Sequence, residues 1–255
     1  MNAGLNLYSI RNLIETEDAF LDTARKLKEM GYSYLQYSGA PYEPDRLRRV
    51  SQAAGLPIVL THVPLDRILN DTDTLMDEHA GFGCKNIGLG SIPLDYLKDE
   101  TQFVEGVSRL DQVGAYMESK GFHFYLHNHH YEFYHLPTVG TAFDYIVANA
   151  PHIHFTLDTY WLQYAGMDIL ATIDRLHGRI GCVHLKDYNV RWTNDNDLAP
   201  VYESVGYGNL DFKAIVSKMK EAGTEYFLVE QDNAANLPDT LHQVERSIRY
   251  ILNEL

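Results

Sequence analysis

Short β-strand-like runs recur along the whole chain, and this recurrence limits the possible folds more than any other feature. Each run is about five to seven residues long, and most are rich in Val, Ile, Leu, Phe or Tyr, as buried strands are. The eight runs are residues 5–10, 32–37, 57–63, 85–89, 122–127, 153–158, 180–185 and 226–230. The sequence therefore predicts eight strands.

Helical patterns lie between the runs. Residues 16–30 place Phe20, Ala24 and Leu27 on one face, and Gly31 follows as a C-terminal stop. Similar patterns are residues 101–120 closed by Gly121, a helix capped by Asp211 and closed by Gly223, and a last helix opened by Pro238. Strand–helix alternation predicts a parallel sheet covered by helices. Eight such units in 255 residues predict a single α/β domain over residues 1–255, a (β/α)8 TIM barrel.

Two further features bear on the kind of ligand. No Gly-rich phosphate fingerprint follows the first predicted strand, which argues against an open nucleotide-binding sheet. The longest irregular stretch, residues 187–210, follows the seventh strand, where we expect a loop at the C-terminal rim that covers a substrate.

Charge and cysteine content narrow the class of partner. The chain has 21 Lys and Arg against 35 Asp and Glu, a formal net charge of −14, and no dense basic cluster, so we expect no nucleic-acid partner. No stretch approaches the ~20 apolar residues of a membrane span, and no signal peptide is evident. Cys84 and Cys182 are the only cysteines, and we expect both to be reduced and buried in a cytoplasmic protein.

Polar and titratable side chains gather where the predicted strands end. The third run ends near His62, and the last four runs end in segments rich in His and carboxylates, which are HNHHYEF from residue 127, DTYW from 158, HLKD from 184 and EQD from 230. In a barrel of parallel strands the chemistry lies at the C-terminal ends of the strands. These segments therefore mark the predicted active site.

The alternation of side chains along a strand sharpens this prediction. If Asp158, His184 and Glu230 point into the barrel, then Cys182, Lys186 and Leu228 do too, while Leu157, Val183, Leu185 and Val229 face the helices. The helix-facing set is then apolar, as a core requires. Burying two carboxylates and an imidazole without a cation is costly, and such a ligand set suits Mn²⁺, Mg²⁺, Co²⁺ or Zn²⁺.

The four segments, in this order on successive strands, resemble the sugar phosphate isomerase/epimerase family of xylose isomerase-like barrels. The opening segment LYSIR from residue 7 resembles the first strand of that family too. The resemblance implies a divalent metal held by a carboxylate after the fifth strand, then by Asp158, His184 and Glu230. The first ligand is carried to Glu132, with His127 or His129 as the alternative, because His127 stands where the best-known ketose epimerases have Glu.

The implied reaction is proton transfer at a carbon next to a sugar carbonyl, through an enediolate stabilised by the metal. Glu132 and Glu230 would be the two catalytic carboxylates that remove and return the proton. We expect the substrate to contact Tyr8, His62, His127, His129, Trp161 and Lys186.

Several alternatives remain open at this stage. The same metal site could dehydrate a keto-sugar or inosose, and the barrel is shared with metal-dependent abasic-site endonucleases, against which the net charge argues. A non-catalytic sugar-binding barrel is a third reading. Glu230 and Asp158 could instead be rim carboxylates paired with Lys186 or Arg191, and Glu132 a solvated loop residue. Exposed aromatic loop residues favour a homodimer.

Overall fold

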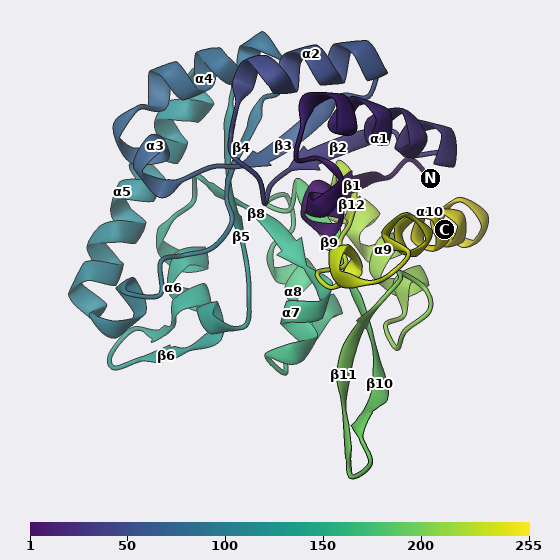
Figure 1. Ribbon diagram of the computed structural model, residues 1–255. Helices are drawn as coiled ribbons and strands as arrows, with labels where there is room; N and C mark the ends of the chain where they lie inside the picture. Colours follow the sequence, from purple (N-terminus) through teal and green to yellow (C-terminus); the bar gives the residue numbers. More distant parts are fainter.

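The computed structural model describes residues 1–255 as a closed barrel of parallel strands ringed by helices (Figure 1). The order of neighbouring strands around the barrel is β1–β12–β9–β8–β5–β4–β3–β2. These strands are β1 (Gly4–Asn6), β2 (Tyr34–Tyr37), β3 (Ile58–His62), β4 (Asn86–Leu89), β5 (His123–His127), β8 (Ile153–Asp158), β9 (Cys182–Leu185) and β12 (Tyr226–Val229). The prediction of a (β/α)8 barrel is confirmed.

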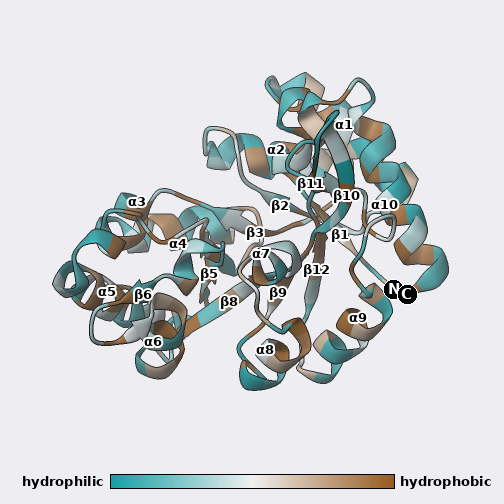
Figure 2. Cartoon of the chain, turned by 90° about the horizontal axis from the view of Figure 1, so that it is seen from below, coloured by the Kyte–Doolittle hydropathy of each residue, from teal (hydrophilic) through white to brown (hydrophobic).

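Ten α-helices cover the strands, and hydrophobic and hydrophilic residues are interspersed along them (Figure 2). They are α1 (Glu17–Met30), α2 (Pro44–Ala54), α3 (Leu65–Asn70), α4 (Thr72–Gly81), α5 (Glu100–Ser119), α6 (Ala142–Asn149), α7 (Thr159–Tyr164), α8 (Ile169–Arg175), α9 (Phe212–Glu221) and α10 (Thr240–Glu254). None is long and apolar enough to cross a membrane. Two predicted helix ends agree with the structure. Gly31 ends α1 in the left-handed region (φ 109°), and Asp211 caps the N-terminus of α9.

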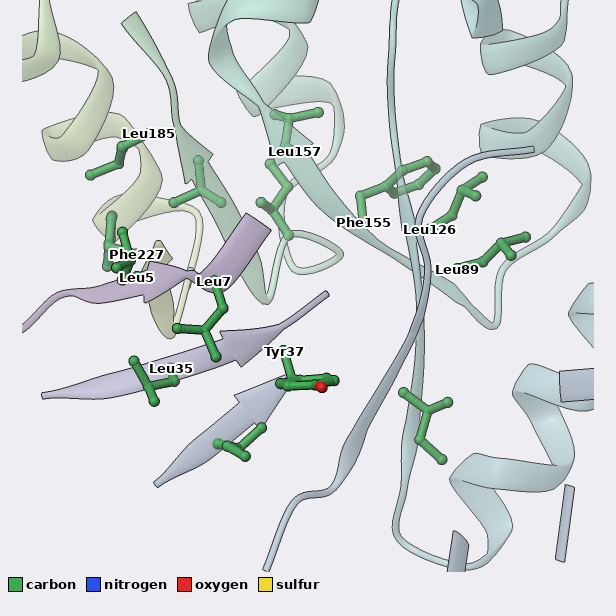
Figure 3. Close-up of a cluster of buried hydrophobic side chains, with 14 of the residues drawn as sticks. Leu5, Leu7, Leu35, Tyr37, Leu89, Leu126, Phe155, Leu157, Leu185 and Phe227 are labelled. Carbon is green, nitrogen blue, oxygen red and sulfur yellow. The ribbon is translucent and has the colours of Figure 1, made fainter. Parts of the chain in front are cut away.

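Two apolar clusters lie on opposite sides of the strands. The larger packs between strands and helices and contains Val183 and Val229. It also contains Leu157 and Leu185, which Figure 3 labels. The smaller fills the barrel interior and consists of Tyr34, Leu60, Tyr125, Cys182 and Leu228. The predicted alternation is confirmed for these residues. Both cysteines are free and buried, also as predicted.

The first predicted strand is wrong in its second half. The strand β1 ends at Asn6, and residues Leu7–Leu13 form the 3-10 helix η1. The side chain of Asn6 accepts a hydrogen bond from the backbone amide of Tyr8 at 3.2 Å. A local bond of this kind competes with the strand ladder, so the chain turns into a helix although residues 5–10 read as a strand.

The stretch over residues 187–210 is largely regular, which corrects the expectation of an irregular loop. It contains an antiparallel hairpin of β10 (Asp187–Asn194) and β11 (Asp197–Glu203) that projects from the barrel (Figure 1). The buried carboxylate of Asp187 fixes the base of this hairpin. It accepts hydrogen bonds from four backbone amides, those of Tyr188, Gly206, Gly208 and Leu210. A second short hairpin pairs β6 (His135–Leu136) with β7 (Gly140–Thr141).

Candidate active site

Four buried side chains meet at the C-terminal end of the barrel. They are His127 from β5, Asp158 from β8, His184 from β9 and Glu230, which directly follows β12. One ligand atom from each lies within 4.8 Å of the others. None is more than 4% exposed, so their charges are largely removed from water. The structure thus brings together three of the four predicted metal ligands and adds His127.

Strand order explains this meeting. The strands β5, β8, β9 and β12 are consecutive neighbours in the barrel, although they are far apart in the sequence. The register pairs Asp158 with His184 directly and His127 with Thr156. Because parallel strands present their C-terminal ends at one rim, the inward-facing residues at or next to these strand ends point into the same space.

Both histidines are oriented by a hydrogen bond on the nitrogen that faces away from the carboxylates. The Nδ1 atom of His127 lies 2.9 Å from the carbonyl oxygen of Gly90, and Nε2 of His184 lies 2.6 Å from Oε1 of Gln36. Since both partners are oxygen acceptors, these nitrogens carry the proton. The other nitrogens face carboxylates, 3.3 Å from Asp158 for His127 and 2.9 Å from Glu230 for His184.

The carboxylates in this space outnumber the single ammonium group. The ammonium of Lys186 lies 2.8 Å from Asp232, 3.3 Å from Glu230 and 3.5 Å from Asp158. Three carboxylates and one ammonium leave two negative charges for a protonated His184 or a bound metal ion to offset. Burial opposes ionisation, but Lys186 together with His127 and His184 outweighs it and holds the pKa values of Asp158 and Glu230 below their usual range. The two carboxylates in turn raise the pKa of His184 to about 9, although burial opposes that charge.

A cavity of about 290 Å³ opens beside these groups. Five of the six predicted substrate-contacting residues line it, namely Tyr8, His62, His127, His129 and Lys186. The sixth, Trp161, stands behind two of them, with its ring 5.3 Å from that of His129 and 5.1 Å from the ammonium of Lys186. Burial lowers the pKa values of His62 and His129, so both rings are neutral hydrogen-bonding groups.

The remaining predicted ligand, Glu132, lies apart from the four. Its carboxylate is fully buried and accepts hydrogen bonds from the backbone amides of His129, at 2.7 Å, and Ile92, at 3.3 Å. Burial raises the pKa of Glu132 to about 7 against the effect of these donors. Its observed contacts therefore fasten the segment after β5, which carries His129, to the loop after β4.

Three further residues complete the site and were not assigned from the sequence. Asn6 donates a hydrogen bond to Glu230 at 2.6 Å, Gln36 joins His62 to His184, and Asp232 pairs with Lys186. Asn6 and Gln36 are polar residues inside apolar strand runs, and that signal could have revealed them. Asp232 stands two residues after Glu230, in a segment already singled out.

A family model described as xylose isomerase-like TIM barrel matches residues 24–253. The chain belongs to this family. The match spans all the residues of the site except those on the first strand and the turn after it. No curated protein matches the chain at a significant level.

Several solved structures superpose on nearly the whole chain. A sugar phosphate isomerase/epimerase from Parabacteroides distasonis ATCC 8503 has 20% identity and a TM-score of 0.79, with 99% of this chain and 98% of that chain covered. The 3-keto-D-glucoside 4-epimerase YcjR from E. coli has 19% identity and a TM-score of 0.69, with 99% of each chain covered. The probable 3-DHS dehydratase AsbF from Bacillus anthracis has 13% identity and a TM-score of 0.71, with both chains fully covered. At these identities the likeness shows the shared fold.

Proposed function

We propose that the protein is a divalent-metal-dependent isomerase or epimerase of a sugar or keto-sugar. One observation carries the proposal. Two buried histidines, His127 and His184, are each anchored through one nitrogen and turn the other toward buried carboxylates. Metal-binding histidines in proteins show this pattern, with the far N–H donated to a carbonyl or carboxylate. In a dry site the nitrogens that face the carboxylates need a cation beside them, and a divalent metal would take the place of the proton that His184 otherwise binds there.

The residues that would hold the metal are His127, Asp158, His184 and Glu230. Two imidazoles and two carboxylates suit Mn²⁺, Co²⁺ or Zn²⁺, and Mg²⁺ with its preference for oxygen is the weaker fit. A divalent charge also offsets the two negative charges left by Asp158, Glu230, Asp232 and Lys186. When bound, the metal would supply Lewis-acid stabilisation of the charge that develops on the substrate oxygens of an enediolate.

The chain's own residues would move the proton and orient the substrate. We assign the removal of the proton next to the carbonyl to the carboxylate of Glu230. Asn6 donates a hydrogen bond to its Oε1 atom at 2.6 Å, while Nδ1 of His184 lies 2.9 Å from its Oε2 atom. Epimerisation needs a second proton-transfer group on the other face of the substrate. The Lys186–Asp232 pair and His129 line the same cavity and are the available groups.

Glu132 takes a supporting role in this proposal. To remove or return a proton, its carboxylate would have to leave the two backbone amides that it accepts from and enter a cavity that it does not line. We therefore assign the first ligand position to His127 and keep Glu132 as the anchor of the His129 segment.

A panel of ketoses and keto-cyclitols, incubated in D₂O with the Mn²⁺-loaded protein and followed by NMR, tests the proposal. We expect deuterium to enter at one carbon next to the carbonyl, with formation of the epimer or the isomeric aldose. Protein stripped of metal is the matched control and should exchange no proton. Loss of water from a keto-cyclitol would instead identify a dehydratase on the same site. Absence of both metal binding and proton exchange would overturn the proposal.

A further inference from the structure

A second group of metal-ligating side chains lies at the opposite, N-terminal end of the barrel. Glu118 near the end of α5, His123 at the start of β5 and His154 near the start of β8 have ligand atoms within 4.8 Å of one another. The proposed active site uses none of them. All three are at least partly exposed, so a cation from solvent can reach them.

A fourth residue, His152, holds this group in place. Its Nδ1 atom lies 2.7 Å from one carboxylate oxygen of Glu118, while Nε2 of His154 lies 2.9 Å from the other. The backbone of His152 is itself fixed on α5, because its amide donates to Asp111 at 2.8 Å and its carbonyl packs against Gly114. A Cβ atom at Gly114 would come within 2.5 Å of that carbonyl oxygen, so only glycine permits this approach.

The two strands that carry this group also carry half of the proposed active site. His123 is the first residue of β5 and His127 is the last. His154 and Asp158 lie on one face of β8, and the residues of each pair are four positions apart. At about 3.3 Å per residue the two groups are separated by ~13 Å along the strands. The ring of Tyr125, which lies 5.5 Å from the ring of His154, belongs to the apolar interior between them. They are therefore separate sites.

We propose that Glu118, His123 and His154 form a zinc-binding site at the N-terminal mouth of the barrel. Two imidazoles and one carboxylate are a ligand set that Zn²⁺ accepts in tetrahedral geometry, with water or His152 in the fourth position. Bonds of about 2.1 Å place tetrahedral ligand atoms ~3.4 Å apart, a closure from 4.8 Å that side-chain rotations supply. A cavity of about 500 Å³ that His123 lines leaves room for the coordinated water.

Binding here would join α5, β5 and β8 at one point. Glu118 belongs to the helix, and the two histidines belong to neighbouring strands whose register pairs Tyr125 with His154. The site thus has a structural role that does not depend on the reaction at the other mouth. It also stands whether or not a metal binds to Asp158 and Glu230.

Zinc titration of the full chain, stripped of metal with a chelator, tests the site by calorimetry. We expect the wild type to bind two equivalents of Zn²⁺. The Asp158→Asn/Glu230→Gln variant should keep one equivalent, and His123→Ala/His154→Ala should keep the other. Loading the first variant with Co²⁺ should give the intense visible absorption of a tetrahedral site, which the further substitution Glu118→Gln removes.

Milder variants guard against a misfolded protein. Glu118→Gln keeps the size of the side chain and one acceptor oxygen toward the histidines, and we expect it to weaken this equivalent at least about tenfold. His152→Ala should weaken it about 10–100-fold, because it removes the partner that orients the carboxylate. The exposed His177→Ala is the matched control and should leave both equivalents unchanged.

The outcomes separate the two metal sites. If Asp158→Asn/Glu230→Gln binds no Zn²⁺, or if His123→Ala/His154→Ala still binds as many equivalents as the wild type, the N-terminal site is refuted. If the wild type binds one equivalent that only the histidine variant loses, the N-terminal site stands and the proposed catalytic metal does not.

Discussion

The Nε2 atom of His184 lies 2.6 Å from the Oε1 atom of Gln36, so a glutamine on β2 decides which nitrogen of this histidine faces the carboxylates. The amide nitrogen of the same glutamine lies 3.0 Å from Nε2 of His62, which fixes the amide's orientation. Gln36 is fully buried and touches neither Asp158 nor Glu230 in the hydrogen-bond network. It acts on the proposed metal through His184 alone.

Replacing Gln36 by Leu is expected to weaken binding of Mn²⁺ or Zn²⁺ at the catalytic mouth about 10–100-fold, because His184 loses the acceptor that selects its tautomer. Calorimetric titration of the metal-stripped protein measures the effect. The exposed Gln52→Leu on α2 is the control. Unchanged affinity in Gln36→Leu would show that the tautomer of His184 is set in another way.

His127 and Glu132 should respond differently to truncation. We expect His127→Ala to lose the catalytic metal, because a proposed ligand is removed. We expect Glu132→Ala to retain it, and to lower the free energy of unfolding by about 1–3 kcal/mol, because two buried backbone amides lose their acceptor. Metal analysis and urea unfolding of both variants provide the measurements. Loss of metal in Glu132→Ala with retention in His127→Ala would reverse the assignment.

Glu230→Gln should abolish exchange of the substrate's α-proton with solvent while the fold remains intact. The amide cannot accept the proton, yet it preserves the size of the side chain and its contact with Asn6. Deuterium uptake by NMR measures the exchange, and circular dichroism checks the fold. Glu225→Gln, at the exposed N-terminal end of the same strand run, is the matched control. Undiminished deuterium uptake in Glu230→Gln would exclude this carboxylate as the base.

The sequence was sufficient to predict the barrel and most of its reactive rim. The alternation of side chains and the positions of the strand ends place Asp158, His184 and Glu230 inside the barrel at the same rim. In a closed parallel barrel, the position of a residue along its strand determines its depth in the barrel. Strand period and strand ends alone do not link Gln36 to His184, since β1 and β12 separate β2 from β9 and the contact runs between side chains across the barrel. Contacts across the barrel depend on register and tilt, which no local pattern encodes.

The location of Glu132 shows a second limit. A carboxylate five residues beyond a strand end can reach the metal or fold back on backbone amides, and only the path of the loop decides between them. The hairpin over residues 187–203 was missed for another reason. Its alternating Tyr188, Val190 and Trp192 before an Asn-Asp-Asn turn are a hairpin signal that the interpretation as a loop overlooked.

Asp187 should control how firmly that hairpin is attached. Its buried carboxylate accepts from four backbone amides, and burial still raises its pKa. We expect Asp187→Ala to cost at least about 2 kcal/mol of stability, because several buried donors lose a charged acceptor at once. Limited proteolysis should then cut within residues 188–210 at lower protease concentrations. Asp195→Ala, at the exposed tip, should leave both properties unchanged, and equal behaviour of the two variants would remove this role.

His79, which belongs to neither proposed metal site, should make the fold sensitive to acid. The ring is fully buried against Phe82, its Nδ1 atom lies 2.7 Å from the carbonyl oxygen of Leu75, and its Nε2 atom lies 2.7 Å from the hydroxyl of Thr61. Burial lowers the pKa of His79 to about 4, whereas the unfolded chain takes up this proton near pH 6.5. The neutral ring's contribution is therefore complete above about pH 6.5 and is lost as the pH falls toward 4.

Over that interval the loss amounts to about 3 kcal/mol at 1.36 kcal/mol per pH unit. Urea unfolding of the wild type and of His79→Gln at pH 7.5, 6 and 5 isolates the loss of stability that is due to His79, because the other titrating groups are common to both proteins. The variant is expected to be less stable at pH 7.5, since it loses the ring's packing, but to lose less stability on acidification. Parallel pH dependences in the two proteins would mean that His79 accepts a proton in the folded state as readily as in the unfolded chain, and the burial argument would fail.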